Sequence, residues 1–539
     1  MSIDESARPG SDVAPPRDED NLPVDKIVFG IAAALAIAFV LFGALNPDGL
    51  NDGTAKALAW MTKSFGWLFV LTSGFFVIFS AYLAFSRYGN IRLGPDDSRP
   101  EFSTFSWVSM MFATGMGIGL MFYGVAEPLY HLNGPPMGMA EPASPEAAQM
   151  AMEYTFFHWG FHPWAMYAVI GLAIGYFAYR KGRGNLVSGT FYPLLGKRAG
   201  EGPGKAIDVI AIFATLFGSA TSLGLGALQI TGGLANVFGH AKYGEGAAVL
   251  VIVVLCTCFV LSAVTGIEKG VKYLSNANAI AAALLVFFLF VVGPTVFILG
   301  TFTESIGGYL THLPTMSFRT GVFGGSEWLN DWTIFYWAWW ISWTPFVGMF
   351  IARISKGRTI RQFVIYVIAV PSLVSFVWFS ILGGAAFDLQ LNQGVDMNGK
   401  LNEGLENALF DTLREYPLST ITMALAVFLI AIFFITGADS ASIVMGMLSQ
   451  NGKEEPQRRL TIFWGVATGA VAAVLLWSGG ENGLNSLKTL VILVAGPFML
   501  ILIAMCFSLL KELRHEPFES TLPGKVRRAV AHAERFPDQ

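Results

Sequence analysis

Long apolar stretches separated by short polar segments run along most of this chain. Each stretch is close to the roughly 20 residues that a helix needs to cross a bilayer. The pattern predicts twelve spans, with centres near residues 36, 75, 118, 164, 222, 257, 286, 341, 376, 432, 468 and 498. The sequence therefore predicts an all-α integral membrane protein with twelve transmembrane helices.

The polar segments divide the chain into candidate units. The N-terminal residues are polar and acidic, which predicts a disordered tail, and they lack the basic start and short apolar core of a cleavable signal peptide. The segment 302–318 is too polar to span and is expected to lie along the outer interface as an amphipathic helix. The expected units are a cytoplasmic tail (1–25), two peripheral helices (26–90), spans 3–7 (105–300), the interfacial helix (302–318), spans 8–12 (327–511) and a short cytoplasmic tail (512–539).

Composition and charge agree with a membrane protein. The chain is 54% hydrophobic and 13% charged, which excludes an ordinary soluble globular protein. With the N-terminus inside, the inner loops hold 18 of the 34 lysines and arginines, whereas the outer loops hold 7. Positive charge favours the cytoplasmic side, so both termini are expected to be cytoplasmic.

Two spans carry residues that interrupt helices. Span 3 contains Gly-Met-Gly-Ile-Gly at residues 115–119, and span 8 contains Pro345 and Gly348. Matching breaks five spans apart predict two inverted five-span repeats, spans 3–7 and 8–12, with a binding site near the midplane. The alternative is that the glycines only let helices pack closely.

Tryptophans gather at the centre of span 8, where Trp337, Trp339, Trp340 and Trp343 lie within seven residues. Tryptophan normally occupies the ends of membrane helices, at headgroup level. Their π faces can form a box for a cation, and quaternary ammonium ligands are the usual guests. The alternative interpretation is a tryptophan-rich packing face between helices.

Span 4 repeats the aromatic pattern with Trp159, Trp164 and Tyr167, which are candidates for the opposite side of the box. His158 and His162 have the i, i+4 spacing of two metal ligands, but no third ligand is evident in the sequence. Two histidines alone rarely hold a metal, so a packing role is favoured for this pair.

Small polar residues gather in spans 5 and 10, including Thr215, Ser219 and Thr436. Their hydroxyls, together with backbone carbonyls freed by a helix break, suit sodium, although such residues also form hydrogen bonds between helices. Glu127 and Asp439 are ionisable groups near membrane depth and are functional candidates for that reason, but Glu127-Pro128 would also suit the outer end of span 3. No nucleotide-binding or hydrolase motif is present, so an enzyme is not expected.

Two long stretches make a family resemblance specific. Residues 115–124 with Glu127-Pro128, and residues 337–350 with 352–355, resemble the signatures of the betaine/carnitine/choline transporter family, in particular its sodium-coupled glycine betaine permeases. The resemblance covers Lys26 to Leu513. It implies the inverted-repeat core of amino-acid/sodium symporters (LeuT-like) and assembly as a homotrimer.

The resemblance also implies roles for individual residues. Substrate binding falls on the two aromatic spans and on the glycines of span 3: Trp159, Trp164, Tyr167, Gly115, Gly117, Gly119, Trp339, Trp340, Trp343 and Phe346. One sodium site falls on Ala113, Met116, Phe433, Thr436 and Gly437, and the other on Thr215, Ser219 and Phe346. Sodium is implied as a co-transported ion, and no cofactor is expected.

Several positions depart from patterns within that family. Gly437 stands where the betaine permeases have a serine, so one sodium ligand is missing or replaced by water. Gly119 replaces the aspartate of proton-coupled choline members, which argues against choline, and span 5 carries no basic residue within the membrane, which argues for sodium. The short C-terminal tail puts osmotic gating in doubt.

The resemblance therefore implies a sodium symporter for glycine betaine in the bacterial inner membrane. Ectoine, proline or a sulfonium betaine is the alternative substrate. An osmosensor or receptor that binds without transporting is the alternative function.

Overall fold

The computed structural model describes residues 22–115, 117–240, 243–265, 268–479, 483–523 and 526. Within these ranges the regular structure is helical, apart from one isolated antiparallel bridge between Arg92 and Thr359. The all-α fold class is therefore confirmed.

Eight helical segments in the described residues are long and apolar enough to cross a membrane, or nine if one sharply bent pair counts as a span. The predicted number of twelve is not established by this criterion. The eight are α1 (Lys26–Leu45), α2 (Pro47–Phe85), α5 with α6 (Pro145–Trp159 and Phe161–Tyr179), α8 (Gly202–Phe238), α14 (Ile360–Leu391), α17 (Ser419–Ser449), α18 (Arg458–Gly479) and α19 (Gly483–Leu513).

The other helices are shorter, more polar or broken. Those that bear on the site are α3 (Thr104–Gly115), α4 (Ile118–Asn133) and α13 (Phe335–Ile354), and the remaining ones are α7 (Tyr192–Leu195), α9 (Glu245–Thr265), α10 (Glu268–Val292), α11 (Thr295–Ser317), α12 (Ser326–Leu329), α15 (Met397–Glu403), α16 (Ala408–Arg414) and α20 (Phe518–Thr521).

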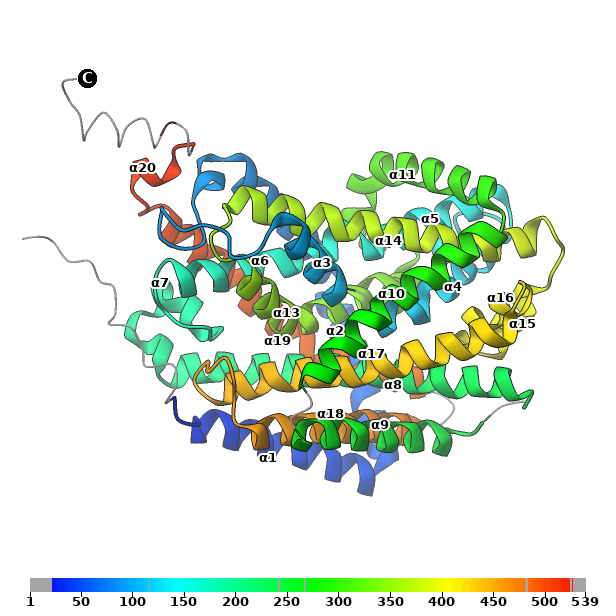
Figure 1. The fold of residues 1–539 in the computed structure, drawn as a ribbon, viewed down its shortest axis with the longest axis horizontal. Coiled ribbons are helices and arrows are strands. Elements are labelled where there is room, and N and C mark those ends of the chain that lie inside the picture. Colours follow the sequence, from blue (N-terminus) through cyan, green and yellow to red (C-terminus); the bar gives the residue numbers. More distant parts are fainter. Residues whose placement is uncertain are drawn as a thin grey trace, which may run out of the picture.

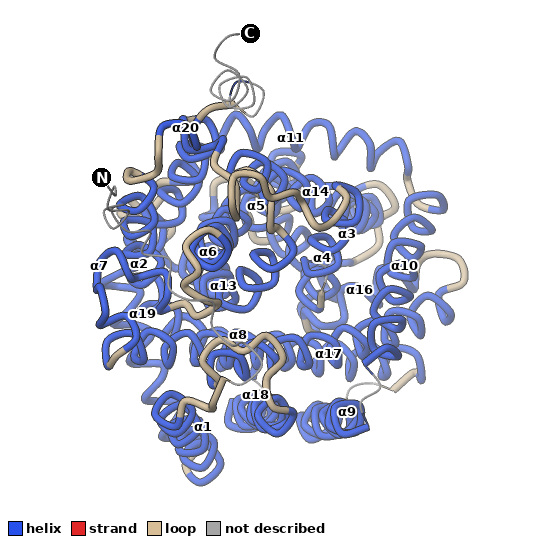
Figure 2. Tube along the Cα trace, turned by 60° about the vertical axis from the view of Figure 1, so that its left-hand side comes forward, coloured by secondary structure: helices blue, strands red, loops and turns tan. Residues whose placement is uncertain are grey.

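The helices are arranged in layers around α13. In both views α1, α18 and α9 lie side by side at one edge of the molecule, with α8 and α17 next to them (Figures 1 and 2). The tryptophan-rich α13 packs against α6, α8 and α19. The most aromatic helix is thus enclosed by other helices and is not exposed at the edge.

The predicted break in span 3 is present. Helix α3 ends at Gly115 and α4 begins at Ile118, after Gly117 in an extended conformation (φ −159°, ψ −169°); Met116 between them is outside the described residues. A second break, which the sequence analysis did not predict, separates α5 from α6 at Gly160 (φ −99°, ψ −128°) in span 4.

The predicted break in span 8 is wrong. Helix α13 continues through Pro345 to Ile354, and the irregular turn comes before the tryptophans, as a π-helix over Asn330–Ile334. Proline leaves the carbonyl four residues earlier without its N–H partner. The Thr344 hydroxyl donates to that carbonyl, of Ile341, at 2.7 Å, so the helix tolerates the proline. A side chain on Gly348 would collide with Ile170, so this glycine serves close packing of α13 on α6.

The expected interfacial helix begins earlier than the sequence suggested. Helix α11 starts at Thr295 instead of residue 302, and it turns from the Asn276–Val292 part of α10 by 109°. Its location along the membrane surface remains a prediction, as does the grouping of the spans into two inverted repeats.

Candidate functional site

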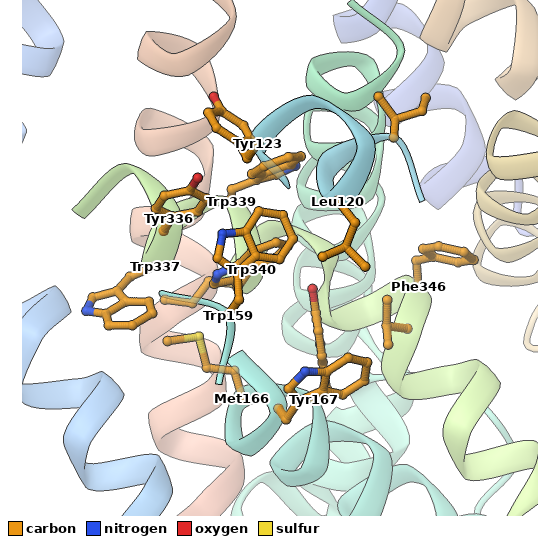
Figure 3. Close-up of a cluster of buried hydrophobic side chains, with 14 of the residues drawn as sticks. Leu120, Tyr123, Trp159, Met166, Tyr167, Tyr336, Trp337, Trp339, Trp340 and Phe346 are labelled. Atoms are coloured by element: carbon orange, nitrogen blue, oxygen red, sulfur yellow. The ribbon is translucent and has the colours of Figure 1, made fainter. Parts of the chain in front are cut away.

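The predicted aromatic residues of spans 4 and 8 meet in the interior of the helix bundle. Trp339 and Trp340 of α13 stack with ring centroids 4.9 Å apart and 10° between planes. Trp159, the last residue of α5, packs edge-to-face on Trp340 at 4.8 Å. The three side chains gather in one cluster (Figure 3) and are 1–6% exposed. We call Trp159, Trp339 and Trp340 the indole cluster.

The remaining predicted aromatics extend the indole cluster on both sides. Tyr167 contacts Trp340 at 6.4 Å and Trp164 at 5.4 Å. On the other side Trp343 contacts Trp339 at 6.3 Å and Phe346 at 5.6 Å. All seven aromatic residues assigned by the resemblance therefore belong to one network of ring contacts. Within the close-up, Leu120 and Phe346 lie to one side of the indoles (Figure 3).

Trp337 belongs to a different environment. Its ring stacks on His162 at 5.2 Å with 18° between planes, and its indole nitrogen has no hydrogen-bond partner in the described part of the chain. The packing interpretation therefore holds for Trp337, and His162 is a packing partner as expected.

Hydrogen bonds fix the orientation of the indoles. The Nε1 atoms of Trp159, Trp339 and Trp340 donate to Glu127 (2.7 Å), to the Ser222 hydroxyl (3.3 Å) and to the His158 carbonyl (3.0 Å). A buried indole N–H without an acceptor is unfavourable, so each bond restricts its ring to one orientation. The π faces are thereby oriented before a ligand binds.

Glu127 of α4 connects α5 and α13 through its carboxylate. Its carboxylate is fully buried and accepts hydrogen bonds from Trp159 and from the Tyr336 hydroxyl, while its other oxygen is 2.7 Å from His158 Nδ1. Glu127 does not end its helix, because α4 continues through Pro128 to Asn133. The sequence pointed to Glu127 only as an ionisable group at membrane depth, and nothing in it indicated the partner Tyr336.

The glycines of span 3 have different surroundings. A Cβ on Gly119 would lie 2.9 Å from Trp339 Cη2 and 3.0 Å from Trp159 Cη2, so only glycine fits there without displacing an indole. Gly117 precedes the first turn of α4, and no heavy atom of the described residues lies within 4 Å of its Cβ position. The first backbone N–H groups of α4, which lack a side-chain cap, form the kind of helix start that binds carboxylates. Gly115 is the last residue of α3, and its surroundings are outside the described residues.

The residues of the second predicted sodium site lie on α8 and α13. Thr215 and Ser219 are buried, and the Thr215 hydroxyl donates to the Ala211 carbonyl at 2.9 Å. Between them Gly218 packs directly against Ser342 and Trp343 of α13. The hydroxyl-bearing stretch of α8 therefore lies against the helix that carries Phe346.

The residues of the first predicted sodium site are only partly described. Phe433, Thr436 and Gly437 lie on α17, which is continuous, and the Thr436 hydroxyl donates to the Ile432 carbonyl at 3.0 Å. Among the described residues, no heavy atom lies within 4 Å of a Cβ placed on Gly437. The Ala113 side chain and Met116 are outside the described residues. Because α17 is unbroken, the predicted site would depend on the break between α3 and α4 for carbonyls freed from helical bonding.

Comparison with known proteins identifies relatives over nearly the full length. A model of the betaine/carnitine/choline family transporters matches residues 27–518. The chain is 49% identical to the glycine betaine transporter OpuD of Bacillus subtilis, over 94% of this chain and 96% of the relative. It is 42% identical to glycine betaine transporter 1 of Vibrio parahaemolyticus, over 91% and 94% of the two chains. It is 41% identical to the betaine/ectoine transporter LcoP of Corynebacterium glutamicum, over 97% of this chain and 82% of the relative. This protein therefore belongs to the betaine/carnitine/choline family of membrane transporters.

Proposed function

We propose that this protein takes up glycine betaine together with sodium across the bacterial inner membrane. The observation that carries the proposal is the indole cluster, whose rings are held by hydrogen bonds and lie next to the start of α4. Its relatives named as glycine betaine transporters support the substrate.

The arrangement suits both ends of a betaine molecule. A quaternary ammonium has no N–H group to donate, so it is recognised through π faces and shape, and each desolvated face is worth about 0.5–2 kcal/mol. The carboxylate is placed at the start of α4, where free backbone N–H groups favour an anion. Gly119, between the two, lets both groups approach because it carries no side chain.

Sodium coupling is proposed from the hydroxyls on α8 and α17. Thr215 and Ser219 lie on either side of Gly218, which packs against Ser342 and Trp343 of α13, and Thr436 directly precedes Gly437 on α17. An ion that contacts the α3–α4 break and α17 would join the substrate-binding helix to the rest of the bundle. Rocking of one bundle against the other would then carry substrate and ion together.

Ectoine is a second candidate substrate, because a relative of 41% identity is named a betaine/ectoine transporter. We further propose that both termini are cytoplasmic, as the distribution of lysine and arginine indicates, and that the protein assembles as a homotrimer.

Reconstituted uptake tests the proposal. Purified protein in proteoliposomes is expected to accumulate labelled glycine betaine with an inward sodium gradient, and not with potassium or a proton gradient alone. Unlabelled ectoine, proline and choline as competitors rank the substrates. Binding of betaine without accumulation or counterflow would identify a receptor, and accumulation that ignores sodium would overturn the coupling.

A further inference from the structure

Three potential metal ligands meet between α4 and α5, on the far side of Glu127 from the indole cluster. Glu127 and His131 are one helical turn apart on α4, and His158 lies next to Trp159 at the end of α5. One ligand atom from each lies within 4.8 Å of the other two, and all three side chains are fully buried. Two imidazoles and one carboxylate are the donor set of zinc sites that have three protein ligands and one open position.

The separations of the ligand atoms suit one small ion. Two ligands each about 2.0–2.1 Å from a tetrahedral zinc stand about 3.3 Å apart. Glu127 Oε1 is 2.7 Å from His158 Nδ1 and 3.5 Å from His131 Nε2. The two histidine nitrogens are within 4.8 Å of each other. To reach the roughly 3.3 Å expected around zinc, each separation therefore needs to change by about 1.5 Å or less. The ion would replace the proton of the hydrogen bond between Glu127 and His158.

His131 has ring nitrogens that are available to bind a metal ion. It is fully buried, and neither ring nitrogen makes a hydrogen bond within the described residues. Its ring packs against Trp332 at 4.5 Å and Trp328 at 5.0 Å, which gives the site an apolar wall. Its Nε2 is 3.5 Å from Glu127 Oε1, too far for a good hydrogen bond, and a buried imidazole without one is unfavourable. An ion between His131 and Glu127 would satisfy the Nε2 atom.

The other two ligands, His158 and Glu127, are already oriented by hydrogen bonds on the side away from the proposed ion. His158 Nε2 is 3.0 Å from the Thr333 hydroxyl, which leaves Nδ1 directed at Glu127. The second oxygen of Glu127 is held by Trp159 and Tyr336. Outer partners of this kind fix ligand orientation in metal sites and raise affinity. From this geometry we infer that Glu127, His131 and His158 bind one zinc ion per chain.

The site was not predictable from the i, i+4 pair of histidines in span 4. His162 stacks on Trp337 and is not part of the group, whereas His131 comes from a different helix. The correct ligands become neighbours only when α4 packs against α5.

Metal binding to the full-length protein in detergent, purified without a polyhistidine tag, tests this inference. Zinc titration by calorimetry is expected to give one site per chain, and cobalt is expected to give the visible absorption of a four-coordinate ion. His131→Gln is expected to weaken zinc binding by about a hundredfold or more, and Thr333→Val, which keeps all three ligands, by about 10–100-fold. Thr333→Val tests the site even if His131→Gln does not fold.

Two matched controls separate this site from other histidines. His162→Gln removes an equally buried imidazole that also lacks a hydrogen-bond partner in the described residues. His312→Gln removes a half-exposed one that pairs with Glu153 at 2.7 Å. Both are expected to bind zinc like the wild type. No saturable binding, or binding that survives His131→Gln and Thr333→Val unchanged, would overturn the inference. The titration contains neither betaine nor sodium, so its result is independent of the proposed transport.

Discussion

The indole cluster and the α17 face of the first proposed sodium site are built in opposite ways. In the indole cluster each indole N–H has its own acceptor, the rings touch, and Gly119 leaves no space for one more carbon atom. At α17 the Thr436 hydroxyl is bonded to its own helix, and the Cβ position of Gly437 contacts no heavy atom of the described residues. The proposed substrate region is therefore ordered without a ligand, whereas the proposed ion site at α17 would have to be completed by the ion, by water or by movement of the α3–α4 break.

The difference predicts where one added atom is tolerated. Gly119→Ala is expected to lower betaine affinity by up to about a hundredfold, because overpacking costs about 1–3 kcal/mol and the indoles cannot move without breaking hydrogen bonds. Gly30→Ala on α1, where a Cβ meets no heavy atom within 4 Å in the described part of the chain, is the matched control and should leave affinity unchanged. Tryptophan fluorescence titration with betaine measures both. If Gly119→Ala binds betaine as tightly as Gly30→Ala, the indole cluster is loosely packed and does not differ from the α17 face in this respect.

The opposite result is expected at Gly437. Gly437→Ser would meet no heavy atom of the described residues within 4 Å at its Cβ, and it supplies the hydroxyl that this position lacks. If a water now completes the ion shell, a fixed hydroxyl saves up to about 2 kcal/mol of immobilisation entropy. The sodium concentration for half-maximal uptake is therefore expected to fall, by up to roughly thirtyfold.

Betaine uptake into proteoliposomes at varied sodium measures this change, with Gly437→Ala as the control that fills space without an oxygen. A Gly437→Ser protein with the wild-type sodium curve would place this position outside the ion shell.

Trp343 lies at the edge of the indole cluster, on the side of Phe346, and tests how far the ordered region extends. Its ring contacts Trp339 and Phe346, but its indole nitrogen has no hydrogen-bond partner in the described residues. Trp343→Leu is expected to weaken betaine binding by roughly tenfold, because one π face is worth up to about 2 kcal/mol.

Trp337→Leu is the matched variant for Trp343→Leu. It removes a tryptophan from the same helix outside the network, so it should lower thermal stability and leave betaine affinity unchanged. If both variants bind betaine like the wild type, Trp343 is a packing residue.

The sequence predicted the features that depend on local chemistry. Glycines at 115–119 indicated the break in span 3, and tryptophans at mid-span indicated an aromatic network, because each residue type is unusual at that position. The predicted break at Pro345 is wrong because the Thr344 hydroxyl replaces the missing hydrogen-bond donor. The Glu127–Tyr336 bond joins residues 209 positions apart, and no local pattern indicates such a pair.

A third region, at the end of α6, is expected to affect neither ligand and so provides a baseline for the comparison. Glu516 is almost fully buried, with Arg180 at 2.7 Å, Lys181 at 3.0 Å and the Tyr176 hydroxyl within hydrogen-bond distance. Burial opposes ionisation of Glu516, but the hydrogen bonds from Arg180 and Tyr176 outweigh it and lower the pKa to about 2. These contacts fasten the segment after α19 to α6.

The lowered pKa gives this third region a pH signature. A carboxyl group with a lowered folded-state pKa stabilises the fold fully above its unfolded pKa, which for glutamate is about 4.3, and loses that contribution as pH falls toward the folded value. At neutral pH Glu516→Gln is expected to cost about 1–3 kcal/mol, since it removes hydrogen bonds to charged groups. The difference in thermal stability between wild type and Glu516→Gln should therefore be constant from pH 8 to about 6 and shrink below about pH 5. Betaine and sodium affinities at neutral pH should match the wild type. A stability difference that does not change with pH would mean that Glu516 is not held as a carboxylate, and altered sodium affinity would connect this segment to the ion site.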